Sequence, residues 1–376
     1  MKFFADVILK DFARTEISRR ENGKLGEYMN NNKVLVAMSG GVDSAAAALL
    51  LKKQGYDISG ITMRLLGESK ELDGNSIQAA EIAKKLNFNH SSVSLTDCFY
   101  QNVILPFIYE YKCGNTPNPC ITCNKKIKFG ALLDICTEQG FDFLATGHYA
   151  RIERDSNGNC LLKKALDEKK DQSYFLWSLK KDALSKIILP LGKFTKEDIR
   201  TLARENGFSN ADRGDSQDIC FIPDGDYVGF LKNKCNVEFN KGNFIDISGN
   251  ILGPHEGIEC YTVGQRKGLG IAFGKPMYVC DKNVELGTVT LCDNAELYKK
   301  DLTATNINIL VGDSLEGNNR LQAKIRYRHT PAAATVTQID QNTLSVIFDE
   351  PQRAITKGQS LVLYDGDTVI GGGIIA

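Results

Sequence analysis

The sequence has no long hydrophobic run and no excess of charge of either sign. No stretch of about 18 uninterrupted apolar residues occurs in the 376 residues, so no membrane-spanning helix is predicted. The 46 basic residues balance the 46 acidic ones, so net charge gives no indication of a nucleic-acid partner, although a local basic face is compatible with this balance. Internal repeats and low-complexity segments are lacking, and the composition is that of an ordinary globular protein.

A signal peptide is not predicted either. Near the amino terminus, Asp6, Lys10, Asp11 and Arg14 interrupt the apolar stretch that such a peptide needs. We therefore expect a cytoplasmic protein in a reducing compartment, where the eleven cysteines are metal ligands, catalysts or small buried residues. Most of them, such as Cys136, are expected to be small buried residues.

Alternating strand and helix patterns from 33 to 221 predict the first folded domain. "KVLVAM" is a short apolar run typical of a buried parallel strand, and helix-like and strand-like segments then alternate as far as "DFLATGHY". This order predicts an α/β fold with a doubly wound parallel sheet covered on both faces. Later in the chain, glycine turns and short strands dominate. We expect a small central domain over 222–285, a C-terminal β-barrel over 286–376 and an N-terminal extension over 1–32.

A glycine-rich turn joins the first strand to the first helix in "VAMSGGVDSAAAALL". Gly40 and Gly41 allow the backbone to turn sharply and to approach a ligand. The helix that begins near Ser44 points free N–H groups and its positive dipole end at an anion, and Asp43 beside it suits a metal carried by phosphate. Because the pattern G-x-x-x-x-G-K-[ST] is lacking, this is not the loop that grips a γ-phosphate.

The string S-G-G-V-D-S in this position resembles the loop of the PP-loop ATP pyrophosphatases, which have an adenine nucleotide alpha hydrolase-like fold. Those enzymes bind ATP on this loop and release pyrophosphate. Seven further strings occur in one order: "TPNPCITCNKKIKFGALL", "ATGHYAR", "KDQSYFLWSL", "DSQDICFIPDGDY", "YTVGQRKGLGI", "IRYRHTP" and "GQSLVLYDGD". Together they are similar to the tRNA-specific 2-thiouridylase (MnmA) family, from about residue 33 to 376.

The resemblance implies a tRNA-uridine 2-sulfurtransferase. In that family ATP, with Mg²⁺, adenylates O2 of the wobble uridine of certain tRNAs, and a cysteine persulfide then delivers sulfur to C2. The implied partners are tRNA and a sulfur-relay protein or cysteine desulfurase that donates the persulfide. No membrane is implied.

The family's functional positions carry over to residues of this chain. Cys123, directly before "NKKIKF", matches the nucleophilic cysteine, and Cys220, in "SQDIC", matches the cysteine that carries the persulfide. The positions that match the nucleotide-binding residues are Ala37, Met38, Ser39, Gly40, Gly41, Val42, Asp43, Ser44, Met63 and Gly147. The positions that match tRNA contacts or the segment facing the target base are Asn118, Pro119, Cys120, His148, Lys170, Asp171, Gln172, Arg326, Tyr327 and Gln359.

Sulfur transfer through a persulfide needs two thiols. One holds the extra sulfur, and the second cuts the S–S bond, which leaves a disulfide between them. Cys123 and Cys220 lie 97 positions apart (220 minus 123), so only the fold can bring them together, with Cα atoms within about 7 Å for a disulfide. They can start apart if a loop moves on tRNA binding. Lys125 and Lys126, with a helix starting near Asn124, are expected to lower the pKa of Cys123.

Cys120 departs from the family pattern, because many members have there an aspartate that is a proposed general acid/base. Two explanations stay open. In the first, the substitution is harmless and Cys123 and Cys220 act as usual. In the second, Cys120, Cys123 and Cys220 hold a [4Fe-4S] cluster whose fourth iron binds the incoming sulfur. Zinc is less favoured, because it normally takes four ligands and only three converge.

Structural interpretations compete with the functional ones at several positions. His148 could be a core histidine with both nitrogens satisfied. Tyr174, Phe175 and Trp177 lie at helical spacing in "KDQSYFLWSL" and are expected in the core rather than as base-stacking platforms. "GQRKGLG" is either a solvated loop or a phosphate contact.

The string "IRYRHTP" is expected to be a strand. One face would then present Arg326 and Arg328 to backbone phosphates, and Tyr327 would point to the other face. Two rival functions remain for the whole chain. One is a related tRNA thiolase or an amide-forming PP-loop ligase, and the other, from a different class, is a non-catalytic tRNA-binding protein.

Overall fold

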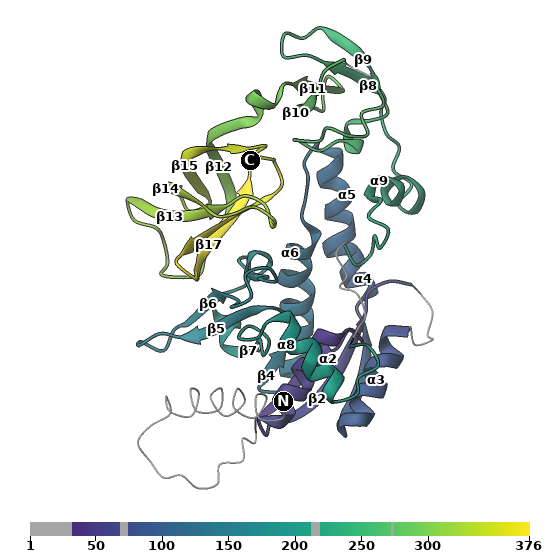
Figure 1. The fold of residues 1–376 in the computed structure, drawn as a ribbon, viewed down its shortest axis with the longest axis vertical. Helices are drawn as coiled ribbons and strands as arrows, with labels where there is room; N and C mark the ends of the chain where they lie inside the picture. Colours follow the sequence, from purple (N-terminus) through teal and green to yellow (C-terminus); the bar gives the residue numbers. More distant parts are fainter. Residues whose placement is uncertain (1–31, 68–73, 212–218, 272–273) are drawn as a thin grey trace.

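The computed structural model describes residues 32–67, 74–211, 219–271 and 274–376 (Figure 1). The N-terminal extension expected over 1–32 therefore lies, apart from its last residue, outside the described part of the chain. Within that part, no helix is both long and apolar enough to cross a membrane.

The first domain is built on a five-stranded sheet in the order β3-β2-β1-β4-β7, with every neighbouring pair parallel. Its strands are β1 (Lys33–Ala37), β2 (Asp57–Arg64), β3 (Asn89–Ser94), β4 (Phe143–Ala145) and β7 (Ile187–Ile188). Along β1, Val34 and Val36 pack in one apolar cluster and Leu35 in another on the opposite face. This alternation confirms the predicted doubly wound sheet with both faces covered.

Helices cover the two faces of this sheet. The first face is covered by α2 (Val42–Lys53), α3 (Gly74–Leu86) and α8 (Lys196–Glu205), which share an apolar cluster with β1. The second face is covered by a continuous helical path of α6 (Pro119–Cys123), the π-helix η2 (Asn124–Ala131) and α7 (Leu132–Glu138). A second helical path precedes it: α4 (Thr96–Phe99), the π-helix η1 (Tyr100–Ile104) and α5 (Leu105–Lys112). Figure 1 shows α5 rising from this domain toward the middle domain described next.

The middle domain contains a four-stranded sheet in the order β10-β11-β8-β9. Its strands are β8 (Gly242–Ile245), β9 (Ile251–His255), β10 (Tyr278–Asn283) and β11 (Thr288–Cys292), preceded by the short helices α9 (Tyr227–Gly229) and η5 (Phe230–Lys234) and interrupted by η6 (Ile258–Cys260). Strand β11 pairs with both β8 and β10. The boundary expected after residue 285 therefore falls after β11, because strand alternation in a sequence does not reveal which sheet a strand joins.

The C-terminal domain is a six-stranded antiparallel barrel that begins after the 3₁₀ helix η7 (Asn294–Leu297). Its strands are β12 (Tyr298–Ile309), β13 (Asn318–Lys324), β14 (Ala332–Asp340), β15 (Thr343–Arg353), β16 (Ser360–Asp365) and β17 (Thr368–Ile375). Pairing of β12 with β17 closes the barrel, as predicted from the strand-like segments over 286–376. Figure 1 shows it, in yellow-green, beside α5 and α6.

The barrel also packs on the first domain. The hairpin of β5 (Ala150–Arg154) and β6 (Cys160–Lys164) joins the barrel edge at a single pair, Lys163 with Thr368. The segment between that hairpin and β7 contains the 3₁₀ helices η3 (Ser173–Phe175) and η4 (Asp182–Lys186). Tyr174 and Trp177 are fully buried there against barrel residues, which confirms that they belong to the core.

The strand predicted for "IRYRHTP" is wrong. Strand β13 ends at Lys324 and β14 begins at Ala332, and His329 N donates to Arg326 O across a turn at 3.1 Å. Arg326 and Arg328 therefore do not share one face of a strand.

Candidate active site

The nucleotide loop, residues 37–44, follows β1 as predicted and leads into α2. Gly40 has φ of +72°, and a Cβ there would lie 2.7 Å from Asn75 O, so only glycine fits. The Ser44 hydroxyl donates to Gly41 O at 3.0 Å and accepts from Ser39 N at 3.2 Å, which closes the turn. Gly41, at the N-cap of α2, has no side chain that could cap the first N–H groups of the helix. Such a helix start, with a glycine turn before it, fits the phosphates of a nucleotide.

Asp43 is held at the edge of this loop by groups from two distant segments. Lys196, at the first position of α8, donates to both carboxylate oxygens of Asp43 at 2.7 and 2.8 Å. The Tyr149 hydroxyl donates to Oδ1 at 2.8 Å. The Lys196 side chain is almost buried, with 10% exposed, so this is a charge-assisted contact of low solvent access. The loop contains no lysine of its own, and the cation beside it is Lys196, which lies 153 positions further along the chain than Asp43.

Gly147, which follows β4, packs directly on the nucleotide loop. A Cβ at this position would lie 2.9 Å from both Asp43 C and Ser44 N. The sequence resemblance implies a nucleotide contact here, and the close approach is compatible with it, because a larger residue would push the loop away.

His148 is buried beside Gly147. Its Nδ1 lies 2.7 Å from the Thr146 hydroxyl and its Nε2 lies 3.4 Å from Lys128 Nζ. Because the ammonium of Lys128 can only donate, Nε2 accepts and the ring proton resides on Nδ1. Burial, and then the charge of Lys128, hold the pKa of His148 well below its usual range, so the ring is neutral at pH 7. This arrangement matches a core histidine with both nitrogens satisfied and leaves the tRNA contact as a prediction.

The paired cysteines lie on α6. Asn118 caps the helix, since its side-chain oxygen accepts from Cys120 N at 3.2 Å. Cys123 is buried among apolar side chains, including Phe107. Burial raises the pKa of Cys123 to about 12, so the expected lowering of that pKa is wrong: loss of hydration outweighs the nearby positive charge.

Cys220 is brought to this region by the residue that follows it. Phe221 is buried in the same apolar cluster as Cys123 and packs edge-on against Phe99 and Phe107, with ring centroids 5.6 and 5.5 Å away. Cys220 itself is exposed. Its thiol is close enough to Cys123 and Cys120 to raise the pKa of each by charge repulsion, after the larger effect of burial. The fold thus packs the segment that carries Cys220 against the helix that carries Cys120 and Cys123.

Lys128 is the cation that these cysteines share. Its charge opposes the burial effect and lowers the pKa values of Cys120, Cys123 and Cys220. The expectation that Lys125 and Lys126 would do this is wrong. The reason is the π-helix η2, where hydrogen bonds run from residue i to i+5. The wider turn favours a position from which the charge of Lys128 acts on the Cys123 thiol, whereas Lys125 and Lys126 are exposed.

A metal cluster does not fit these cysteines as they stand. Within the described ranges, no three or more His, Cys, Asp or Glu side chains are grouped so that they could hold a metal ion. Burial also raises the pKa values of Cys120 and Cys123, whereas a cluster requires thiolates. The geometry therefore does not favour the [4Fe-4S] alternative, and no step is assigned to such a group.

Several residues matched to tRNA contacts are engaged inside the protein. Asp171 is buried and accepts from Ala165 N, Ser173 N and the Ser173 hydroxyl. Gln172 accepts from Tyr149 N at 2.9 Å, and its own N–H donates to Tyr149 O at 2.7 Å. The "KDQ" string therefore holds the tyrosine that contacts Asp43. This structural role of Gln172 could not be predicted from the three-residue string alone.

The matched barrel residues are engaged in a similar way. Arg326 donates to Val263 O and Ala354 O at 2.9 and 2.8 Å. Tyr327 packs on Phe175 with ring centroids 4.4 Å apart. These contacts join the barrel to the middle domain and to the first domain, and the tRNA-binding roles of Arg326 and Tyr327 stay predictions.

Three further matched positions, Met63, Lys170 and Pro119, lie elsewhere in the first domain. Met63 lies on β2 and is partly buried between two apolar clusters. Lys170 is partly exposed at the end of a turn closed by its N–H and Asp167 O. Pro119 is the buried first residue of α6. Their roles likewise stay predictions.

Lys196, Tyr149 and Lys128 were missed by reasoning from sequence. Lys196 follows Thr195, whose capping box with Asp198 marks the start of α8, so the helix start was readable but its partner was not. Lys128 is five residues after Cys123, a spacing that points to a common face only if a π-helix is assumed.

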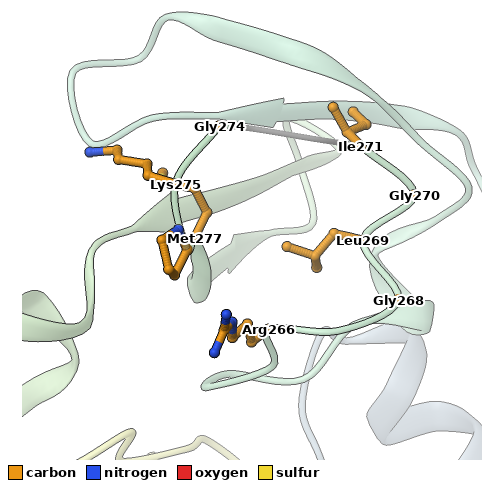
Figure 2. Close-up of a pocket in the computed structure, with 9 residues that line it drawn as sticks. Arg266, Gly268, Leu269, Gly270, Ile271, Gly274, Lys275 and Met277 are labelled. Atoms are coloured by element: carbon orange, nitrogen blue, oxygen red, sulfur yellow. The ribbon is translucent and has the colours of Figure 1, made fainter.

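A pocket in the middle domain lies apart from this site. Figure 2 shows it lined by Arg266, Leu269, Ile271, Lys275 and Met277. It is formed by the segment that contains "GQRKGLG", and the two cationic residues leave the phosphate-contact interpretation of that string open. None of the residues that carry the cysteine and nucleotide chemistry lines this pocket.

Comparison with known families matches the three domains in order. The tRNA methyl transferase HUP domain matches residues 32–224, the tRNA methyl transferase PRC-barrel domain matches 229–293, and the aminomethyltransferase beta-barrel domain matches 299–375.

Curated relatives are similar over nearly the full length. The chain is 48% identical over 354 residues to the tRNA-specific 2-thiouridylase MnmA of Clostridioides difficile, covering 92% of this chain and 98% of that protein. It is 46% identical over 358 residues to the tRNA-specific 2-thiouridylase MnmA of Acetivibrio thermocellus, covering 92% and 100%. It is 45% identical over 350 residues to the tRNA-specific 2-thiouridylase MnmA 1 of Clostridium botulinum (strain Okra), covering 92% and 99%.

Proposed function

This chain belongs to the tRNA-specific 2-thiouridylase family, and from that premise we propose how its own residues carry out 2-thiolation of the wobble uridine of tRNA. The enzyme is a tRNA-uridine 2-sulfurtransferase that uses ATP. The observation that carries the residue assignment is a chain of contacts. It runs from the nucleotide loop through Gly147 and His148 to Lys128, which is near Cys123 and Cys220.

The nucleotide loop is proposed to hold ATP by its phosphates. Backbone N–H groups at the start of α2 would bind them, and Lys196 would add the positive charge that the loop lacks. Asp43 is the carboxylate of the loop, and in the nucleotide complex it would exchange Lys196 for Mg²⁺. ATP supplies the AMP group that turns O2 of the uridine into a leaving group.

Cys220 and Cys123 are proposed to carry the sulfur. The terminal sulfur of a Cys220 persulfide attacks C2 of the activated uridine, a C–S bond forms, and AMP leaves with O2. The Cys123 thiolate then attacks Sγ of Cys220. That attack breaks the bond between Sγ and the transferred sulfur, leaves the sulfur on C2, and joins Cys123 to Cys220 in a disulfide. An external thiol must reduce this disulfide before the next turnover.

Lys128 and His148 are proposed to support the thiol step. Lys128 lowers the pKa values of the thiols, and neutral His148 accepts a hydrogen bond from the ammonium at 3.4 Å and so fixes its position. With Cys120 in place of the usual aspartate, no carboxylate is assigned an acid/base role at that position. The substitution is then compatible with the two-thiol route.

The partners follow from the same chemistry. The macromolecular substrate is tRNA, and the persulfide is proposed to come from a sulfur-relay protein or a cysteine desulfurase in the cytoplasm. The names of two matched domains refer to methyl transfer. Two thiols beside a loop of the pyrophosphatase type favour adenylation and sulfur transfer instead, in agreement with the names of the full-length relatives.

The test is reconstitution. Purified protein, unmodified tRNA, ATP with Mg²⁺, a cysteine desulfurase and cysteine are incubated, and digested tRNA is analysed by liquid chromatography and mass spectrometry. We expect 2-thiouridine at the wobble position and one AMP and one pyrophosphate for each sulfur transferred. Pyrophosphate release without any thiolated base, or thiolation of a different base, would contradict the proposal.

A further inference from the structure

The segment that leads into the cysteine helix is fastened to a loop of the barrel. Thr116 N donates to Lys357 O at 2.9 Å, and Gln359 Nε2 donates to Thr116 O at 2.7 Å. Both backbone hydrogen-bonding groups of Thr116 are therefore satisfied by a domain more than 240 positions away in the chain. We call the barrel loop 354–359 the clasp.

Gly358 lets the two segments approach closely. Its φ is +85°, and a Cβ there would lie 2.9 Å from both Asn115 Cβ and Thr116 N. A side chain at this position meets both a strained backbone and occupied space. Gly358 N also donates to Ile375 O at 2.9 Å, which ties the clasp to the last barrel strand.

The clasp is held rigidly from its other side. Arg326 donates to Ala354 O and to the Thr356 hydroxyl, and also to Val263 O of the middle domain. Ala354 has φ of +56° and is buried, a conformation that needs support from its surroundings. One loop of the barrel thus contacts the middle domain through Arg326 and the first domain through Thr116.

The distance along the chain from the clasp contact to the cysteines is short. Thr116 lies two residues before Asn118, the cap of α6, and Pro119 restricts the backbone of Asn118 to extended conformations. A displacement of Thr116 therefore passes to Cys120 and Cys123, because the intervening residues have little freedom to absorb it.

We propose that the clasp positions the cysteine helix α6. The way the barrel packs on the first domain then also sets the position of Cys123. Gln359 is then a positioning residue that acts through Thr116. This inference rests on the proposed function and adds a reason why a tRNA-binding barrel is joined to a sulfurtransferase domain: a tRNA that moves the barrel also moves the thiols.

The test uses two variants and two matched controls in the full-length protein. Gln359→Glu keeps the shape but replaces the donor by a carboxylate that repels Thr116 O, and Gly358→Ala fills the contact. Gln352→Glu is the control for the first, because the Gln352 amide donates to Glu350 O within the barrel. Gly317→Ala is the control for the second, because Gly317 has a similar φ of +64° but open space around it.

Three quantities are measured for each protein: the rate of Cys123 alkylation by iodoacetamide without tRNA, the Kd for unmodified tRNA, and kcat for 2-thiouridine formation at saturating tRNA. We expect Gln359→Glu and Gly358→Ala to speed alkylation and to lower kcat, each by about tenfold, because a small displacement of reacting groups is costly. The Kd is expected to stay unchanged, and both controls are expected to behave as the parent protein.

The opposite pattern would overturn the inference. A weaker Kd with unchanged alkylation would make Gln359 a direct tRNA contact, as the sequence resemblance implies. Unchanged values throughout would show that the clasp does not position the helix. If Gly358→Ala fails to fold, Gln359→Glu still decides the matter. Alkylation needs no tRNA or ATP, so the clasp is tested even if the parent protein makes no 2-thiouridine.

Discussion

The nucleotide loop and the cysteine site lie at the same end of the sheet but are built in opposite ways. The loop is closed by its own hydrogen bonds, and Asp43 already has both oxygens occupied by donors. At the cysteine site Cys123 is buried with a raised pKa, whereas its partner Cys220 is exposed on a separate segment. The hydrogen bonds that shape the nucleotide loop are thus already formed, whereas the buried Cys123 thiol is protonated and unreactive at neutral pH.

The difference has a chemical reason. ATP is bound by backbone groups and charges that can be fixed in advance at little cost. A persulfide and a thiolate that met permanently would react without substrate: the thiolate would attack Sγ, form the disulfide and release the outer sulfur as hydrosulfide. Burial of Cys123 raises its pKa and restrains that reaction, so activation of the thiols can be left to tRNA binding.

The largest effect is expected from removing either thiol. Cys123→Ser and Cys220→Ser should each lower 2-thiouridine formation by roughly a thousandfold, and the double variant should be no worse, because the two thiols act as one unit. ATP binding should remain, which separates the two regions. Cys113→Ser changes another exposed cysteine and should have no effect. Additive losses in the double variant would contradict the paired mechanism.

The next largest effect is expected on the nucleotide side. Lys196→Met removes the cation that binds Asp43 and should lower kcat/KM for ATP by about a hundredfold, as loss of one preorganised charge does. Pyrophosphate release is the measurement, with Lys53→Met on the exposed face of α2 as the control. Cys123 alkylation should not change. If alkylation changed as much as ATP use, the two regions would not be separable.

A third prediction concerns pH on the cysteine side. The pKa of Cys123 is about 12, so its thiolate fraction rises with pH across the neutral range. Lys128→Met removes the charge that lowers this pKa, so the pKa rises further and the thiolate fraction falls, by about tenfold for each unit of pKa. The pH profile of Cys123 alkylation should move to higher pH. Lys126→Met removes the same charge from an exposed position and should leave the profile in place; equal shifts in both variants would show that only net charge matters.

The smallest effect is expected from the Tyr149 hydroxyl. Tyr149→Phe removes one hydrogen bond to Asp43 and should raise KM for ATP by about fivefold, the typical value of a single hydrogen bond. The measurement is initial pyrophosphate release against ATP concentration. A loss as large as that of Lys196→Met would mean that the hydroxyl, rather than the ammonium, carries the positioning of Asp43.

Sequence reasoning was most successful where chemistry and local structure coincide. The loop at 37–44 was readable because glycine turns and helix starts are set by neighbouring residues. Lys196 and Tyr149 were not, because their partner Asp43 is more than 100 positions away in the chain. Lys128 was missed because a π-helix changes which residues share a face. The boundary after β11 and the internal contacts of Arg326 and Gln359 depend on strand pairing and domain packing, which no single string encodes.

The most direct test of the account is the fate of the two thiols after one turnover. The persulfide-loaded enzyme is mixed with tRNA and ATP in the absence of reductant, and a non-reduced digest is analysed by mass spectrometry. The account predicts one Cys123–Cys220 disulfide for each 2-thiouridine formed. Formation of 2-thiouridine with both thiols still free, or with a disulfide to a different cysteine, would contradict it.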